Sequence, residues 1–155
     1  MAKVKAQKII NAPVSEVWKT WDDFAGISRF NPNVRASFLL SDSAETGKGA
    51  MRQCDFSDGK NHVRERIIGY EPGKKMVVDI YEGTVPLKRA VAAVTFKSLG
   101  DTRTQVTMEM DFVPKMGLLG KMMIPLMKPQ FRKAISALLR GNAEFIERGI
   151  VAHAA

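Results

Sequence analysis

The sequence is short of the residues that usually build metal and redox sites. Its 155 residues include one cysteine, Cys54, and two histidines, His62 and His153. A lone cysteine cannot form an internal disulfide, which is typical of a reducing compartment. These scattered side chains match no zinc-ligand spacing and assemble no Ser/His/Asp or Cys/His catalytic arrangement. We therefore expect no metal and no cofactor.

Long apolar runs are also missing. No stretch of about 18 uninterrupted apolar residues occurs, which argues against a transmembrane helix. The opening residues 1–7 are charged from the third position and lack the apolar core of a secretory signal. Together with the single cysteine, this predicts a cytoplasmic protein. We expect the chain to form one domain over residues 1–155.

Positive charge is in excess, because 24 Lys and Arg face 16 Asp and Glu and give a net charge of +8. The basic residues gather near the C-terminus, where only Glu144 and Glu147 oppose them. A phosphate-binding stripe has this pattern, but no recognition motif accompanies it. The pattern favours the solvated face of an amphipathic helix over specific nucleic-acid binding. A transient attraction to anionic membrane surfaces stays open.

Hydrophobic periodicity divides the chain into helices and strands. Residues 4–10 predict a strand, and 14–22 and 24–30 predict two short helices. Further strands are predicted at 34–40, 49–56, 61–70, 75–82, 87–97 and 103–112. The turns between them are too short for crossover helices, so the sheet should be antiparallel. A long helix should begin after Pro129 and run to about Ile150.

This order of elements predicts an α+β helix-grip fold. A curved antiparallel sheet of about seven strands must cover one apolar face. The C-terminal helix is the only element long enough to cover it. The two short helices between the first and second strands would close one end, and a cavity is expected between sheet and helix.

Three segments carry a family pattern: Ile9–Trp18 followed by Asp23-Phe24 and Asn31-Pro32, then Asp58–Ile67, then Gly117–Lys121 leading into Phe131-Arg132. They resemble the polyketide cyclase/dehydrase branch of the SRPBCC, or START-like, superfamily. The resemblance covers essentially the whole chain and implies a helix-grip domain with a hydrophobic cavity. Members of that family bind lipids, sterols, plant hormones, polyketides or quinone-like molecules. A minority catalyse cyclisation, aromatisation or dehydration, so fold alone does not separate carrier from enzyme.

Glu65 is the first candidate anchor for a ligand. Strand parity places it on one face with Val63 and Ile67, and it places Arg64 and Arg66 on the other. On a cavity wall, Glu65 would be a lone carboxylate that orients a ligand hydroxyl or acts as a general acid or base. The plant-hormone receptors of the resembled family carry a pocket glutamate in a similar setting. A rim glutamate paired with a basic neighbour is the alternative.

Other residues are expected to line the same cavity because they share an apolar face of their strand or helix. They are Cys54, Phe56, Ala90, Ala92, Met108, Met110, Phe131 and Ile135. The alanines suggest room for a ligand, although close packing of helix on sheet explains them equally well. Cys54 is expected to be an inert buried thiol. Asn142 interrupts the apolar stripe of the long helix and would meet a ligand, a trapped water or the sheet backbone.

Two segments are candidate gates to the cavity. Residues 116–127 are rich in methionine, which suits a surface that accepts varied apolar shapes. They would form a lid, or a patch that touches membrane while collecting a lipid, and ordinary core packing is the alternative. Residues 83–86 form a second candidate gate, or a plain hairpin turn.

Three functions follow from these observations. The first is binding or carriage of a small hydrophobic molecule (a lipid, polyketide or quinone), with Glu65 and Asn142 as polar anchors. The second is a polyketide cyclase or dehydratase that uses Glu65 as its acid or base. The third is a protein-interaction module that uses the basic helix face, which predicts a cavity too small for a ligand and binding that weakens with salt. The shortage of proton-transfer residues favours binding over catalysis.

Overall fold

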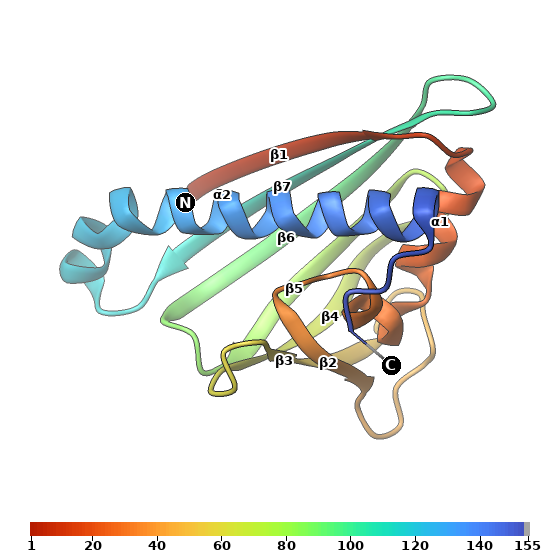
Figure 1. The fold of residues 1–155 in the computed structure, drawn as a ribbon. Helices are drawn as coiled ribbons and strands as arrows, with labels where there is room; N and C mark the ends of the chain where they lie inside the picture. Colours follow the sequence, from red (N-terminus) through yellow and green to blue (C-terminus); the bar gives the residue numbers. More distant parts are fainter. Residues whose placement is uncertain (154–155) are drawn as a thin grey trace.

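A computed structural model describes residues 1–153 and shows a curved sheet wrapped around one long helix (Figure 1). Its elements are β1 (Ala2–Ile10), α1 (Val14–Asp22), the 3-10 helix η1 (Phe24–Arg29), β2 (Val34–Leu39), β3 (Met51–Phe56), β4 (His62–Glu71), β5 (Lys75–Gly83), β6 (Leu87–Ser98), β7 (Thr104–Pro114) and α2 (Gly117–Arg148). Every predicted strand is present, with each boundary within two residues of its prediction. The predicted α+β helix-grip fold is confirmed.

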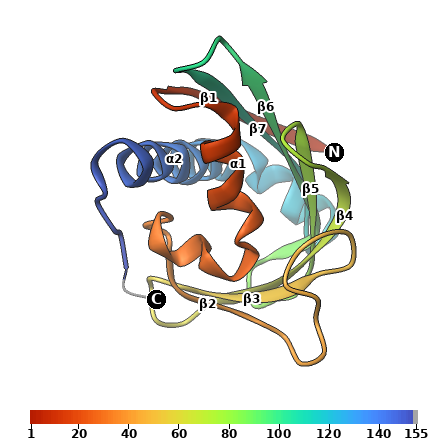
Figure 2. The same cartoon turned by 90° about the vertical axis from the view of Figure 1, so that its right-hand side faces the viewer.

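The seven strands form one antiparallel sheet in the order β1-β7-β6-β5-β4-β3-β2. The first strand therefore pairs with the last, and Ala2 lies opposite Phe112. Inward and outward side chains alternate along β7, since Val106 and Phe112 are buried while Glu109 on the outer face approaches Lys3 and Lys5 at 3.5 and 3.7 Å. This alternation turns one apolar face of the sheet toward α2, which lies inside the curve (Figure 2).

The short helices α1 and η1 close one end of the space between sheet and helix. The Trp18 ring packs edge-on against Phe96 at 5.3 Å, and Trp21 packs against the same ring at 6.0 Å. Asp22, the last residue of α1, accepts a hydrogen bond of 2.7 Å from the Tyr70 hydroxyl of β4. This hydrogen bond raises the pKa of Tyr70 above its ordinary value. Aromatic packing and one partly buried hydrogen bond thus hold α1 against the sheet.

The C-terminal helix begins earlier than predicted. It runs from Gly117 and contains Pro125 and Pro129, whereas the prediction placed its start after the second proline. A proline inside a helix lacks one N–H donor and usually breaks the helix. Here the helix continues through both, and only the residue after Arg148 ends it, because Gly149 adopts a left-handed conformation with φ of +67°.

Candidate functional site

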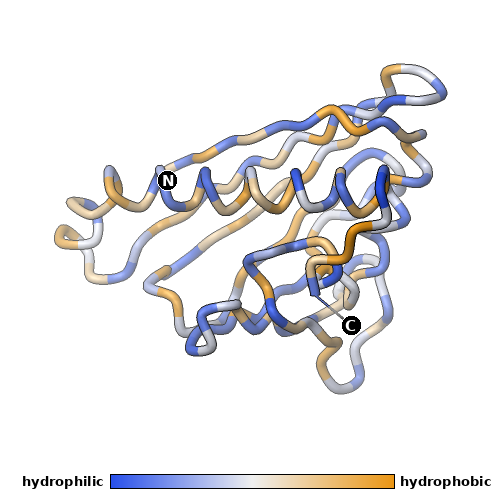
Figure 3. Tube along the Cα trace, in the orientation of Figure 1, coloured by the Kyte–Doolittle hydropathy of each residue, from blue (hydrophilic) through white to orange (hydrophobic). Residues whose placement is uncertain are grey.

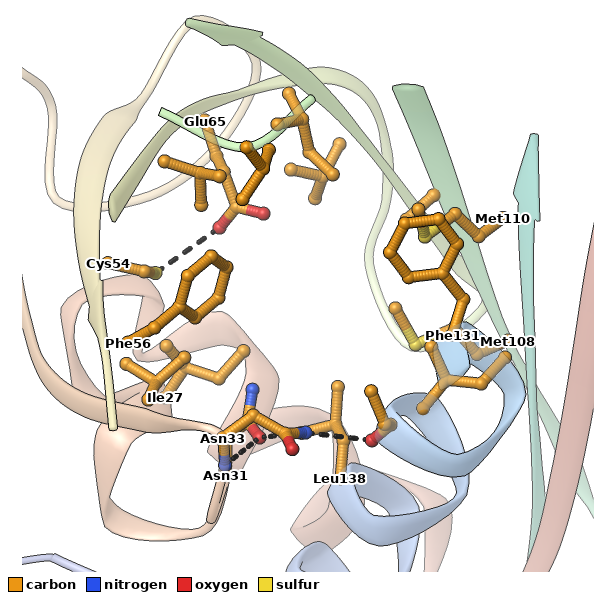
Figure 4. Close-up of a pocket in the computed structure, with 18 of the residues that line it drawn as sticks. Ile27, Asn31, Asn33, Cys54, Phe56, Glu65, Met108, Met110, Phe131 and Leu138 are labelled. Carbon is orange, nitrogen blue, oxygen red and sulfur yellow. Dashed lines mark hydrogen bonds between the residues drawn. The ribbon is translucent and has the colours of Figure 1, made fainter. Parts of the chain in front are cut away.

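A cavity of about 460 Å³ lies between the sheet and α2. Its wall comes from α1, η1 and the segment after it, from strands β2 to β7, from the β3–β4 and β5–β6 connections and from α2. Most of the lining side chains are apolar. Small-molecule sites in proteins usually enclose about 300–1,000 Å³ within mostly apolar walls. The predicted space between sheet and helix is therefore present and is large enough for a small ligand (Figure 4).

Most of the predicted ligand-contacting residues line this cavity. They are Val63, Glu65, Cys54, Phe56, Ala92, Met108, Met110, Phe131 and Ile135. They come from five strands and helices that lie far apart in sequence, and the fold brings them to one space. Strand parity, and for Phe131 and Ile135 the apolar stripe of the helix, were enough to place them on the inner face. That they contact a ligand stays a prediction.

Ile67 and Ala90 are buried outside the cavity wall. Ile67 is 1% exposed within the main hydrophobic cluster, and Ala90 is fully buried in a second cluster with Val4 and Phe112. Both have the inward parity that was predicted, but neighbouring side chains cover them. Parity gives the face of a strand, and it does not say how far along that face an internal space extends. Their assignment as cavity residues is therefore corrected.

Asn142 is also absent from the described part of the cavity wall. Its Oδ1 accepts a hydrogen bond of 3.0 Å from Trp21 Nε1, and its Nδ2 donates to Thr20 Oγ1 at 2.9 Å. The side chain is fully buried, and both ends of its amide have partners. These bonds join α2 to α1 at the closed end of the fold. Asn142 thus has a structural role in this arrangement.

Replacing Asn142 with leucine should lower the free energy of unfolding by about 2 kcal/mol, because the indole N–H of Trp21 would be buried without an acceptor. Chemical denaturation measures this loss. A double variant that also carries Trp21→Phe removes the unpaired N–H donor and should recover part of the lost free energy of unfolding. Ligand affinity should stay unchanged in Asn142→Leu. A variant with parental stability and lost ligand binding would return Asn142 to the ligand site.

Glu65 lies in the cavity and is paired, so it is not the lone carboxylate that was predicted. Arg52 Nε donates a hydrogen bond of 2.8 Å to Glu65 Oε1. The two residues are directly opposite each other on β3 and β4. The side chains are only 6% and 13% exposed, so this is a largely desolvated ion pair. Arg52 was missed, although it shares the strand parity of Cys54 and Phe56, which were assigned to the inner face.

Arg52 is held on its other side by η1. Its Nη1 donates to the backbone oxygen of Phe24 at 2.8 Å, and its guanidinium carbon lies 3.9 Å from the centre of the Phe24 ring. Burial alone would lower the pKa of Arg52, but the negative charge of Glu65 and their hydrogen bond raise it above its ordinary value. The guanidinium therefore stays charged and neutralises Glu65 inside the cavity.

The carboxylate of Glu65 keeps one oxygen for the cavity. Its two hydrogen bonds within residues 1–153 both end on Oε1, which accepts from Arg52 Nε at 2.8 Å and from Cys54 Sγ at 3.3 Å. Figure 4 shows the Glu65 carboxylate directed into the open space, with Cys54 on one side. Oε2 is thus the acceptor that a bound molecule would meet. The remaining charged residue of the wall, Asp58, lies on the exposed β3–β4 turn, where the Lys60 and Asn61 amides donate to it.

The wall opposite Glu65 carries two asparagines, Asn31 and Asn33, and Asn33 bonds to α2 (Figure 4). Asn33 Nδ2 donates to the backbone oxygen of Ala134 at 2.8 Å and to Asn31 Oδ1 at 2.9 Å. Asn31 Oδ1 also accepts from the backbone N–H of Asn33 at 3.0 Å, so the contacts of this pair fix the chain after η1 against α2. The sequence pattern did not single out Asn33, because a bond to the backbone of α2 about a hundred residues later leaves no trace in local periodicity.

Cys54 is a buried thiol, as expected. It is 2% exposed, and burial together with the charge of Glu65 strongly raises its pKa. In the unfolded chain a cysteine ionises near pH 8.5, at about its ordinary pKa. The fold therefore favours the neutral thiol. The contribution of the neutral Cys54 thiol to the free energy of unfolding is complete below about pH 8.5 and is lost progressively as the pH rises further.

Alkylation of Cys54 by iodoacetamide should accordingly be at least about a hundredfold slower in the native protein than in urea at the same pH. The native rate should also show no inflection between about pH 7 and 10, because the thiolate does not accumulate in that range. Mass spectrometry follows the modification directly. A fast native reaction with a midpoint near neutral pH would instead indicate an activated nucleophile.

The two candidate gates differ in position. Val85, in the 83–86 segment, lines the cavity, and the backbone N–H of Lys115 donates to Pro86 at 3.0 Å. No residue of 116–127 lines the cavity in the described structure, since the α2 residues of the wall begin at Phe131. Of the two candidate gates, the β5–β6 connection is therefore the one that borders the cavity, and the residues before α2 are hydrogen-bonded to it.

Comparison with known proteins agrees with this architecture. A family model described as polyketide cyclase / dehydrase and lipid transport matches residues 1–143. Among curated proteins, none matches the chain in sequence.

Solved structures share the fold at low sequence identity. A START superfamily protein from Mycobacterium smegmatis superposes with a TM-score of 0.79 at 14% identity, covering 94% of this chain and 97% of that one. The Zhui aromatase/cyclase from Streptomyces sp. R1128 gives 0.75 at 18% identity, covering 95% and 94%. A protein from Thermus thermophilus gives 0.78 at 19% identity, covering 96% and 99%. At such identities the matches show a common fold and leave the ligand open. With the family model spanning nearly all of its length, the chain belongs to the polyketide cyclase / dehydrase and lipid transport family of the SRPBCC superfamily.

Proposed function

We propose that this protein binds and carries a small, neutral, hydrophobic molecule that has one hydrogen-bond donor. The observation that carries the proposal is the cavity of about 460 Å³, whose apolar wall contains one charge-compensated carboxylate. The apolar body of the ligand would fill the space beside Met108 and Phe131. Its donor, a hydroxyl or an N–H, would bind Glu65 Oε2.

The pairing of Glu65 with Arg52 determines the charge of the ligand that fits. An unpaired carboxylate in an apolar site would favour a cation, but here the guanidinium at 2.8 Å already balances the charge. A neutral ligand then adds no uncompensated charge to a desolvated space. A hydrogen bond to a charged acceptor contributes about 1.5–3 kcal/mol, and each buried methylene adds about 0.8 kcal/mol. Apolar burial therefore supplies most of the affinity, and Glu65 sets the orientation.

The cyclase or dehydratase hypothesis is less well supported by the wall. Proton transfer would need groups whose pKa lies near the working pH. The described wall contains no histidine, lysine or tyrosine, Cys54 is held neutral, and one oxygen of Glu65 is occupied by Arg52. The protein-interaction module predicted a cavity too small for a ligand, and the observed volume argues against it.

Native mass spectrometry of protein purified from its own host, followed by organic extraction, tests the proposal. We expect a stoichiometric neutral compound with an apolar body and at least one hydroxyl or N–H. Returning the extracted compound to empty protein separates carrier from enzyme, because a carrier releases it unchanged. Repeated recovery of empty protein that takes up no lipid, quinone or polyketide from a panel would contradict the proposal, and conversion of the compound would favour the enzyme.

A further inference from the structure

The first turns of α2 expose an apolar surface that the cavity does not explain. Six large apolar side chains there are between 50% and 79% exposed: Met116, Leu118, Leu119, Met122, Met123 and Leu126. We call these six residues the α2 outer face. Figure 1 shows this end of the helix extending past the ends of β6 and β7, and Figure 3 shows apolar colour along it. The fold leaves this surface in water.

The beginning of α2 carries apolar side chains both on the side that faces the protein and on the side that faces solvent. Leu118, Met122 and Leu126 are spaced four residues apart and share one side of the helix. On the opposite side, Ile124 and Met127 pack against the second hydrophobic cluster. A solvent-facing side is normally polar, because an amphipathic helix hides only one apolar stripe. Contiguous exposed apolar surface of this kind marks an interaction site.

The charges beside the α2 outer face identify the partner. Lys115, Lys121 and Lys128 flank it, and residues 115–143 contain no acidic residue. None of these three lysines forms a salt bridge within the described chain. Exposed apolar side chains beside lysines are the pattern of helices that lie at the surface of anionic membranes. A second copy offering the same surface would instead bring like charges together across a symmetric interface.

We propose that the α2 outer face docks this protein on an anionic lipid bilayer, with the helix lying in the interface plane. No helix of residues 1–153 is long and apolar enough to span a membrane, so the contact is peripheral. The six apolar side chains enter the headgroup region while the lysines pair with lipid phosphates. Because Lys115 is hydrogen-bonded to Pro86, docking brings the β5–β6 connection at the cavity rim close to the lipid.

Co-sedimentation with vesicles tests this inference on the intact protein without any cavity ligand, so its result is independent of the proposed function. The vesicles are phosphatidylcholine alone or phosphatidylcholine with about 30% phosphatidylglycerol. We expect binding to the anionic vesicles only, weakening as salt rises from about 0.05 to about 0.5 M. The variant Leu118→Glu/Met122→Glu should lose at least about tenfold in vesicle affinity.

Two control variants separate docking from general charge effects. Ile9→Glu/Phe38→Glu makes the same substitutions at exposed apolar side chains of β1 and β2, and it should keep vesicle affinity within about twofold. Lys121→Gln/Lys128→Gln should flatten the salt dependence, whereas Lys74→Gln/Lys97→Gln should not. Equal loss in both glutamate variants, or no binding to anionic vesicles, overturns the inference. A dimer seen by sedimentation velocity and abolished by Leu118→Glu/Met122→Glu, without vesicle binding, also overturns it and assigns the surface to a second copy.

Discussion

Replacing Arg52 with methionine should lower the free energy of unfolding by about 3–5 kcal/mol. The substitution keeps a long apolar side chain against Phe24 but leaves the Glu65 carboxylate in a site where it is only 13% exposed. A buried charge that loses its partner keeps its full desolvation penalty. Urea denaturation at neutral pH measures the change, and a loss below about 1 kcal/mol would mean that water reaches the pair freely.

A double variant separates the role of the pair in stability from its role in binding. Arg52→Met/Glu65→Leu removes both charges, so its stability should return to within about 1 kcal/mol of the parent. Its affinity for a neutral naphthylamine fluorophore with one N–H donor should nevertheless fall by about 10- to 100-fold, the value of one lost hydrogen bond to a charged acceptor. Unchanged affinity in a stable double variant would remove Glu65 from the binding site.

Filling the cavity should abolish binding without damage to the fold. Ala92 lies on the cavity wall, where it pairs with Val78 and Met110 on the neighbouring strands. The variant Ala92→Phe would place an aromatic ring in the space of about 460 Å³ and exclude a ligand of comparable size. Fluorophore affinity should fall by at least about a hundredfold. Stability should change by less than about 1.5 kcal/mol, because the ring enters a space that is not packed.

The adjacent residue supplies a matched control for that experiment. Ala93 follows Ala92 on β6, and its side chain points to the other face of the sheet. Ala93→Phe makes the same change in size and hydrophobicity outside the cavity, so fluorophore affinity should stay within about twofold of the parent. Retained binding in Ala92→Phe would place the ligand elsewhere and contradict the proposed function.

Much of the fold could be predicted because its signals are local. The alternation of β7, with Val106 and Phe112 inward and Glu109 outward, depends only on neighbouring residues. The turns that separate the strands also have local chemistry. The start of α2 was the main error, because Pro125 and Pro129 are read as helix breakers while the helix in fact accommodates both.

The candidate site was predicted less fully because its polar contacts join distant parts of the chain. Parity found Glu65, but its partner Arg52 lies on another strand, and only their register shows that they are opposite. Asn142 was recognised as a polar residue on an apolar stripe. Its partners Thr20 and Trp21 lie on α1, more than a hundred residues earlier, and no local pattern connects them. Ile67 and Ala90 show the related limit, since the extent of an internal space depends on packing.

The pairing of β1 with β7 affects how the protein is made. Ala2 lies opposite Phe112, so the first strand to leave the ribosome finds its partner only after 110 further residues have been added. At about 5–20 residues per second this takes roughly 5–20 s. During that interval the apolar side of β1, including the buried Val4 and Ile10, has neither its neighbouring strand nor α2 to cover it. Completion of the sheet is therefore a late event in synthesis, and until then Lys3, Lys5 and Lys8 of β1 are the charges that oppose association of this strand with other chains.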